Sequence, residues 1–263
     1  MQKDSVIGTL VTALVVCVVC SLLVSGSAVS LKEKQQANKK LDIKKNLLLA
    51  SGLITEQEAT AENIERAFAD IDAQVIELAT GEPAPDLSAN TFDQRKAAKN
   101  PEQNKQIDPK ADSARIKQRS KYSIVYQVKD NGQTQMYIFP VHGKGLWSTL
   151  YGFIALASDL QTVEGIGFYE HKETAGLGGE VDNPDWKASW KGKKIYDDQF
   201  EVELQVIKGK VNPQDKNADV KIDGLSGATI TSNGVTGLVR YWFGPDGFGP
   251  YIEKARTAEV PAQ

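Results

Sequence analysis

The sequence is poor in the residues that build metal centres. Its 263 residues include two histidines, His142 and His171, and two cysteines, Cys17 and Cys20. A structural zinc or iron–sulfur site needs about four clustered ligands of these types. The chain therefore cannot build such a site alone. Both cysteines lie in an apolar N-terminal run, and we interpret them as small apolar residues of a membrane segment.

Patterns for binding nucleotides and nucleic acids are also missing. No Gly-x-Gly-x-x-Gly follows a predicted strand, and Gly-x-x-x-x-Gly-Lys-Ser/Thr does not occur. A net charge of −3 gives no indication of nucleic-acid binding. The chain has no internal repeat. What remains is an ordinary globular composition, 41% hydrophobic and 25% charged, in a chain long enough for one or two domains.

Charge is absent from the sequence between Ser5 and Leu31, and residues 6–24 are dense in Val, Leu and Ile. This run can cross a bilayer as a helix. It is longer than the apolar core of a cleaved signal peptide, roughly 7–15 residues, although Ser25-Gly26-Ser27-Ala28 could pass as a cleavage site. Val15-Val16-Cys17 lacks the small residues of a lipoprotein signal. We predict a retained anchor over residues 1–31, followed by a domain over 32–263.

Helical patterns follow the anchor. We predict a polar helix over 32–50 that Gly52 ends, and a second helix that opens at Thr60. Residues 82–120 are rich in Pro, Asn, Gln, Lys and Asp, which predicts a long surface excursion whose basic run over 110–121 is a solvated edge. The apolar stripe of the second helix consists of Ile64, Phe68, Ile71 and Val75, and Gly81 and Pro83 end this helix.

Strand patterns begin at Tyr122. Segments 122–128 and 135–139 flank Asn131-Gly132, a dipeptide typical of a type I′ hairpin turn. Strands over 151–157 and 162–168 form a second pair, and 201–207 alternates like another strand. Together with the flanking helices, these strands predict an α+β fold with a mostly antiparallel sheet.

A run of small residues and hydroxyls, residues 223–234, leads into a further predicted helix. Gly227 and Ala228 allow tight turns and close approach. Thr231 or Ser232 is a suitable N-cap for the helix. A small-residue loop at a helix N-terminus favours an anion, although an ordinary loop and cap would have the same shape. The apolar residues that define the helix are Val235, Leu238, Val239 and Trp242.

A second glycine-rich stretch, residues 171–179, follows the strand that ends at Phe168. Its His, Glu and Thr offer polar contacts to a heteroaromatic ring, but a surface turn is an equal alternative. The pair His171 and Glu173 would also suit acid–base catalysis, yet no nucleophile accompanies it. Upstream, Trp147 either borders a ligand or belongs to the core. Asn183-Pro-Asp-Trp186 predicts a helix start, with Trp186 and Trp190 as packing residues.

Both stretches resemble the FMN-binding domain family. Asp223-Gly-Leu-Ser226-Gly227-Ala228-Thr229 resembles its flavin-attachment motif, and this resemblance implies that Thr229 carries FMN through a phosphoester, placed there by a flavin transferase. Residues 171–178 resemble its His-x-Glu-Thr-x-Gly-Leu-Gly motif, and residues 143–147 its Gly-x-Gly-Leu-Trp segment. The resemblance implies cofactor-binding roles for Ser226, Gly227, Ala228, Thr231, Asn233, Trp147, His171, Glu173, Thr174, Gly176, Leu177 and Gly178, with Ser232 as a further cap or phosphate contact.

The anchor, the excursion and both motifs together are similar to the C subunits of bacterial Na⁺-translocating NADH:quinone oxidoreductases. The resemblance implies an inner-membrane relay protein. Its covalent FMN would pass electrons from an intramembrane iron–sulfur centre to the FMN of the B subunit, with the B, D and E subunits as neighbours. NADH binding, quinone reduction and Na⁺ transport would occur elsewhere in the complex, and the relay itself would need no catalytic residue and no metal.

Three alternatives stay open at this point. One is the corresponding subunit of the ferredoxin:NAD⁺ oxidoreductase complex, and another is a membrane-tethered sensor or binding domain without electron transfer. The third is a structural domain whose loops merely resemble the motifs. The resemblance implies a periplasmic domain, whereas the positive-inside rule favours the cytoplasm. Only Lys3 precedes the apolar run, and the lysines that follow it are Lys32, Lys34, Lys39, Lys40, Lys44 and Lys45.

Overall fold

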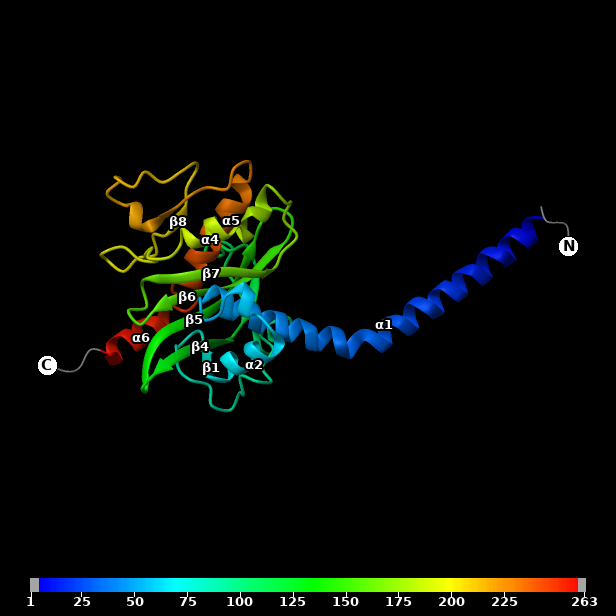
Figure 1. Cartoon of the computed structure of the whole chain (residues 1–263), viewed down its shortest axis with the longest axis horizontal. Coiled ribbons are helices and arrows are strands. Elements are labelled where there is room, and N and C mark those ends of the chain that lie inside the picture. The colour runs from blue at the N-terminus through cyan, green and yellow to red at the C-terminus, as the bar shows by residue number, and fades with distance from the viewer. Residues whose placement is uncertain (1–4, 260–263) are drawn as a thin grey trace. The chain divides into compact units, whose positions relative to one another are not determined.

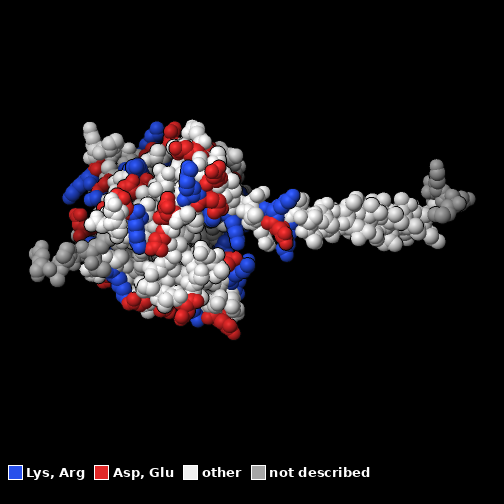
Figure 2. Space-filling model, turned by 60° about the horizontal axis from the view of Figure 1, so that its bottom comes forward, with Lys and Arg blue, Asp and Glu red and all other residues white. Residues whose placement is uncertain are grey.

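The computed structural model describes residues 5–259 and divides the chain into two units, Met1–Ile43 and Lys44–Gln263. Helix α1 (Val6–Ala50) fills most of the first unit, and its C-terminal turns belong to the second. Its first turns carry exposed apolar side chains, seen as an uninterrupted white surface in Figure 2. Within residues 5–259 it is the one helix long and apolar enough to cross a membrane. The helix continues past residue 31 without a break.

The second unit is built on a five-stranded antiparallel sheet in the order β1-β4-β5-β6-β7 (Figure 1). Asn131 and Gly132, between β4 and β5, have φ values of 50° and 82°, as a type I′ turn requires. Both predicted strand pairs are confirmed. The strands are β1 (Ile71–Glu77), β4 (Tyr122–Asp130), β5 (Gln133–Lys144), β6 (Thr149–Ala157) and β7 (Val163–Glu170).

The second predicted helix is much shorter than its apolar stripe suggested. Thr60 caps α2 (Ala61–Ala69) as expected, accepting a hydrogen bond from the N–H of Asn63, but the chain then enters β1. The prediction that Ile71 and Val75 lie in this helix is therefore wrong. Pairing with β4 buries Val75 and its neighbour Ile76. The apolar spacing fits a helix or a strand, and this tertiary contact selects the strand.

Residues 82–120 are more ordered than a surface excursion. They hold helix α3 (Gln94–Ala97) and a small hairpin of β2 (Asn104–Gln106) and β3 (Gln118–Ser120). Arg119, which the sequence suggested to be part of a solvated edge, is 1% exposed. Its guanidinium donates to the hydroxyl of Tyr241 at 3.1 Å and to the carbonyl of Ser120 at 2.8 Å, which lets the cation be buried.

Helices cover the sheet. Helix α5 (Thr229–Trp242) packs on β5, and the ring of Phe139 in β5 contacts Phe243 and also Phe248, just before α6 (Gly249–Glu259). Phe68 of α2 packs edge-on against Tyr126 of β4. The last turn of α1 lies against β7, where a Cβ on Gly165 would collide with the carbonyl of Ala50.

The segment between β7 and α5 is mostly irregular. The strand predicted over 201–207 is wrong in extent, because only β8 (Gln205–Val206) forms, pairing in parallel with β9 (Lys221–Ile222). Asn183 caps α4 (Pro184–Ala188) as predicted. Trp186 and Trp190 are buried and meet edge to face with ring centroids 5.4 Å apart, which confirms their packing role. The 3-10 turns are η1 (Glu56–Glu58), η2 (Gly178–Asp182) and η3 (Ala218–Val220).

Candidate functional site

The carboxylate of Glu173 joins the three sequence segments that were singled out above. Oε2 accepts hydrogen bonds from the hydroxyl of Thr231 at 2.6 Å and from the N–H of Leu146 at 3.1 Å. Oε1 accepts from the N–H groups of Trp147 and Ser148 at 3.0 and 3.1 Å. These four bonds, which we call the Glu173 tie, connect the 143–148 loop, the 171–178 loop and helix α5.

The tie keeps Glu173 ionised. Burial would raise the pKa of this side chain, which is 9% exposed, but the hydroxyl of Thr231 and three backbone N–H groups outweigh burial and hold the pKa below its ordinary value. Its acceptor capacity is spent within the chain. The geometry therefore assigns Glu173 to positioning of the loops, a role that the sequence pattern did not reveal.

Two glycines are required by the tie itself. A Cβ on Gly178 would lie 2.6 Å from Oγ1 of Thr231, and one on Gly145 would lie 2.6 Å from Oε1 of Glu173. Gly227 has a φ of 70°, and its Cβ would meet Cδ2 of Leu177 at 2.9 Å. The two motifs thus touch one another. At these positions the glycines let two segments of the chain approach each other.

Gly176 differs from these glycines. It has a φ of 74°, and a Cβ there would meet no atom within 4 Å. Its turn is formed by the carbonyl of Thr174, which accepts from the N–H groups of Leu177 and Gly179. The backbone conformation, and not crowding, is what requires glycine at this position.

His171 fixes the start of the same loop. Its Nε2 lies 2.7 Å from Oδ2 of Asp182, and its Nδ1 accepts from the N–H of Glu173 at 3.1 Å. The neutral ring therefore carries its proton on Nε2. Hydrogen bonding to Asp182 raises the pKa of His171. The partner Asp182, in the turn after the motif, has no signal in the sequence.

Helix α5 begins earlier than the sequence indicates. Its first residue is Thr229 and its N-cap is Ala228, which has no side chain to close the helix end. The prediction that Thr231 or Ser232 caps a helix starting near Ser232 is wrong. Both lie inside the helix, 1% and 4% exposed, because the Thr231 hydroxyl donates to Glu173 and Oγ of Ser232 accepts from the N–H of Leu225.

The hydroxyls of Ser226 and Thr229, in contrast, are exposed. Within residues 5–259 the Thr229 hydroxyl makes no hydrogen bond. It faces a hollow of about 450 Å³, which we call the Thr229 hollow. Two lysines that sequence reasoning missed, Lys208 and Lys210, also line it, because the N–H of Gly224 donates to the carbonyl of Gly209 and fixes that turn beside the motif. The remaining lining comes from Val206, Ile207, Gly209, Gly224, Leu225, Ser226, Gly227, Ser232 and Asn233.

Large apolar side chains stand exposed on the segments around Thr229. Trp147 is 66% exposed, which excludes the core role considered for it. Leu146 and Leu177 are each 43% exposed and Ile230 is 49% exposed. Thr174 is exposed as well. Outside the first turns of α1, the one further large apolar residue exposed in the described chain is Leu53.

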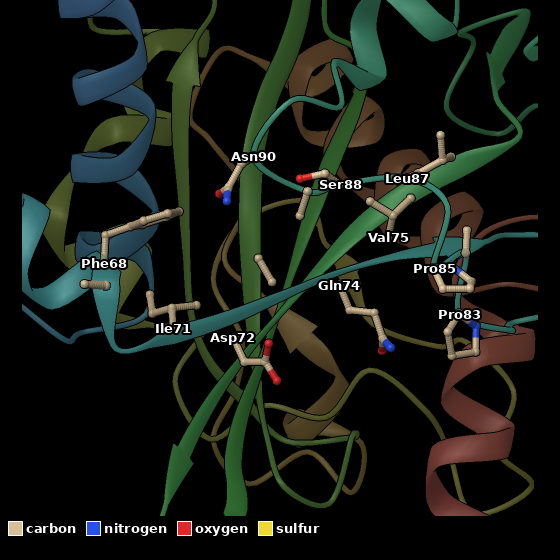
Figure 3. Close-up of a pocket in the computed structure, with 14 residues that line it drawn as sticks. Phe68, Ile71, Asp72, Gln74, Val75, Pro83, Pro85, Leu87, Ser88 and Asn90 are labelled. Carbon is tan, nitrogen blue, oxygen red and sulfur yellow. The ribbon is translucent and has the colours of Figure 1, made fainter.

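A hollow larger than the Thr229 hollow lies elsewhere in the described chain. It measures about 590 Å³ and runs along β1 under the loop that carries Leu87 and Asn90 (Figure 3). None of the predicted site residues lines it, and neither does any lysine or arginine. Within residues 5–259, no group of three or more His, Cys, Asp or Glu side chains is arranged to hold a metal ion.

Comparison with known proteins accounts for this geometry. The model of the FMN-binding domain family matches residues 145–244, the range that holds every predicted site residue. The C subunit of the Na(+)-translocating NADH-quinone reductase of Pseudomonas aeruginosa is 45% identical, and the alignment covers 98% of this chain and 99% of the relative. The C subunit of the same enzyme from Haemophilus ducreyi is 44% identical over 97% of this chain and 96% of its own.

Solved structures agree with the sequence comparisons. The crystal structure of Shewanella oneidensis NqrC superposes with a TM-score of 0.75 at 34% identity, covering 84% of this chain and 99% of that one. The crystal structure of the C subunit from Parabacteroides distasonis gives a TM-score of 0.62 at 26% identity, over 84% and 96% of the two chains. With an FMN-binding domain behind a single apolar helix, and full-length relatives well above 30% identity, the chain belongs to the family of Na(+)-translocating NADH-quinone reductase C subunits.

Proposed function

We propose that this chain holds FMN as a phosphoester on Oγ of Thr229 and acts as an electron relay in a Na⁺-translocating NADH:quinone reductase. The observation that carries the proposal is the contrast between two threonines. Thr229 is exposed and its hydroxyl makes no hydrogen bond within residues 5–259, whereas Thr231 is 1% exposed and donates to Glu173. Thr229 is therefore the acceptor that a flavin transferase can reach.

The surroundings of Thr229 fit a phosphate group. The N–H groups of Thr229, Ile230 and Thr231 precede the first intrahelical bond, from Ser232 to Ala228, and no side chain caps this helix end. The positive end of the helix dipole lies at the same residues and favours an anion. Lys208 and Lys210 line the hollow and supply positive charge. Gly227 and Ala228 are small and leave the hydroxyl accessible.

The exposed side chains on the segments near Thr229 fit a flat heteroaromatic ring. Trp147, Leu177 and Ile230 offer apolar surface, and Thr174 offers a polar contact. The Glu173 tie holds the loops that carry Trp147 and Leu177 against α5, so its role is to position them. When bound, FMN accepts and releases electrons in single steps, which is the chemistry that the chain itself lacks.

Within the complex, we propose that this domain lies between an intramembrane iron–sulfur centre of neighbouring proteins and the FMN of the B subunit. The B, D and E subunits are the proposed neighbours. Covalent attachment suits a relay, because the cofactor cannot dissociate between turnovers. The domain itself needs no general base. This fits a site in which the one buried carboxylate, Glu173, is fully engaged with donors of the chain.

Peptide mass spectrometry of protein from the native host tests the attachment site. We expect one FMN phosphoester on the peptide that contains residues 226–234, lost in Thr229→Ala and kept in Thr231→Ala. Ser226→Ala is the matched control, because Ser226 is the other exposed hydroxyl of the motif. An adduct that survives Thr229→Ala, or disappears only in Ser226→Ala or Thr231→Ala, would refute the assignment.

We also propose that the domain after the anchor is periplasmic, where it meets the transferase. Lys32 to Lys45 on α1 argue for the opposite orientation by the positive-inside rule, so the question needs its own experiment. A reporter fused after Gln263 decides it. Alkaline phosphatase activity supports the periplasm, and fluorescence from a reporter that matures only in the cytoplasm contradicts it. A periplasmic location would fit both this complex and the ferredoxin:NAD⁺ oxidoreductase. Identifying the proteins that co-purify with the chain distinguishes the two.

A further inference from the structure

A second cation-lined cavity lies apart from the Thr229 hollow and shares no lining residue with it. It measures about 280 Å³ and is formed by α3, the 115–118 loop and the ends of β5, β6 and β7. Four lining residues are cationic and none is acidic. These are Arg95, Lys99, Arg115 and Lys117.

One of the four cations is already neutralised. Arg95 makes a bidentate ion pair with Glu170, with N···O distances of 2.7 and 2.8 Å, and its guanidinium lies 3.8 Å from the ring centroid of Tyr151. Arg95 and Tyr151 therefore form a fixed wall. The excess positive charge of the cavity comes from the other three cations.

Those three cations have donors to spare. Nη2 of Arg115 donates to the carbonyl of Lys144 at 2.9 Å, which anchors the guanidinium. Its Nε and Nη1 donate to no residue among 5–259, and in the same range Nζ of Lys99 and of Lys117 forms no hydrogen bond or ion pair. All three side chains are exposed, so water screens their mutual repulsion, and an anion in the cavity would meet three positive charges.

The backbone holds this arrangement in an unfavourable conformation. Arg115 and Lys117 have φ values of 55° and 67°, in the left-handed region that non-glycine residues rarely adopt. The carboxylate of Asp112 maintains the turn by accepting from the N–H groups of Ile116 and Lys117 at 2.9 and 2.7 Å. Strained residues of this kind persist where the surrounding structure fixes them, often at binding sites.

We propose that this cavity, the Arg115 cavity, binds a phosphate group, either the head group of an anionic phospholipid or a soluble phosphate ester. The planar guanidinium of Arg115 matches two phosphate oxygens, and Lys99 and Lys117 act as point charges beside it. Tyr151 and Tyr169 line the remaining space with rings that suit the carbon skeleton attached to the phosphate. The proposal does not depend on the flavin, since none of these residues lines the Thr229 hollow.

Calorimetric titration of the full-length protein in non-ionic detergent tests the proposal. The probes are inorganic phosphate and short-chain phosphatidylglycerol. We expect Lys99→Gln with Lys117→Gln to weaken binding at least about tenfold, the effect of losing strong charge-assisted contacts. The matched control is Lys110→Gln with Lys216→Gln, which removes the same charge from two exposed lysines outside the cavity and should bind like wild type.

Lys99→Arg with Lys117→Arg keeps the charge, and we expect it to retain binding, which shows that a loss in the glutamine variant is not unfolding. Binding of phosphatidylglycerol alone identifies a lipid head group, and binding of phosphate alone identifies a soluble ester. The proposal is overturned if neither probe binds, or if the glutamine variant binds both as tightly as the control.

Discussion

The two ends of one short helical segment differ in what surrounds them. At Thr229 the side chains are exposed, the helix end is uncapped and no hydrogen bond engages the hydroxyl within residues 5–259. Two residues further on, Thr231 lies in the Glu173 tie, where four donors meet one carboxylate. Residues two apart on a helix project about 200° apart. One turn of α5 therefore presents an exposed face, which carries the proposed acceptor Thr229, and on its other side the buried Thr231 that bonds Glu173.

This contrast teaches how the site divides its work. We expect the exposed groups proposed to meet the cofactor to contribute little to stability, and the buried Glu173 tie to contribute mainly to stability. Substitutions in the tie should therefore lower the free energy of unfolding, whereas substitutions of the exposed groups should affect only the proposed binding of the cofactor. Three predictions test this division, and each is measured as the free energy of unfolding of the full chain.

The largest effect is expected for Glu173→Ala. It leaves the Thr231 hydroxyl and three N–H groups without their acceptor, and we expect a loss of about 3 kcal/mol. Thr174→Ala is the control in the same loop, because its side chain is exposed, and should change stability by less than about 0.5 kcal/mol. Equal losses in both variants would mean that the tie is no more important than its surroundings. Denaturant unfolding provides the measurement.

Acid should destabilise the domain in two steps, of which the first comes from a histidine outside the Glu173 tie. The pKa of His142, in β5, is lowered to about 4 by burial and by Arg95. A depressed pKa means that the unfolded chain takes up the proton first, so stability is full above about pH 6.5 and falls towards pH 4. Between pH 7 and pH 5 we expect His142 to contribute a loss of about 2 kcal/mol, measured as the difference between wild type and His142→Gln. The comparison with the variant is needed because the raised pKa of His171 adds stability over part of the same range.

Glu173 adds the second step. Burial raises the pKa of Glu173, but the hydrogen bonds from Thr231 and the backbone outweigh burial and lower it. Its contribution to the free energy of unfolding is therefore present above its ordinary pKa and is lost as the pH falls further. Glu173→Gln should reduce this later loss and leave the first step unchanged. Part of the later loss remains, because hydrogen bonds also lower the pKa values of Glu58, Asp159 and Asp215. If His142→Gln flattened both steps together, the two groups would not titrate independently.

The smallest effect comes from the two threonines themselves. Thr231→Val removes one donor from the tie and should cost about 1 kcal/mol. Thr229→Val changes an exposed hydroxyl that has no partner among residues 5–259 and should stay within about 0.5 kcal/mol, although it abolishes the proposed phosphoester. If denaturant titration showed a larger loss for Thr229→Val than for Thr231→Val, the exposed proposed acceptor would also be structurally important.

The sequence predicted the elements whose signals are local. Asn131-Gly132 specifies its own turn, and Asn183 before Pro184 specifies its own helix start. It failed where the deciding contact is remote. Ile71 and Val75 fit a helix or a strand equally, and only β4, which begins at Tyr122, selects the strand. Ala228 gives no capping signal, so the start of α5 could not be read locally.

The candidate site shows the same limit. Each motif was recognisable by itself, and the structure brings both together with residues 143–148. The function of Glu173 as their common acceptor depends on three segments far apart in sequence, so no local pattern encodes it. Lys208 and Lys210 line the Thr229 hollow because the pairing of β8 with β9 and the bond from Gly224 to Gly209 hold their turn beside the motif.

The strand order has a consequence for how the domain folds. Strands β4, β5, β6 and β7 are joined in sequence, so each can pair with its predecessor as soon as it forms. Strand β1 must wait for β4 across the whole of residues 78–121, and closing so long a loop slows its pairing. The outer edge of β4 therefore stays open during assembly. In pulse-labelling hydrogen exchange, the amides of Gln74 and Ile76, whose N–H groups face β4, should become protected after that of Ile154 in the central strand β6.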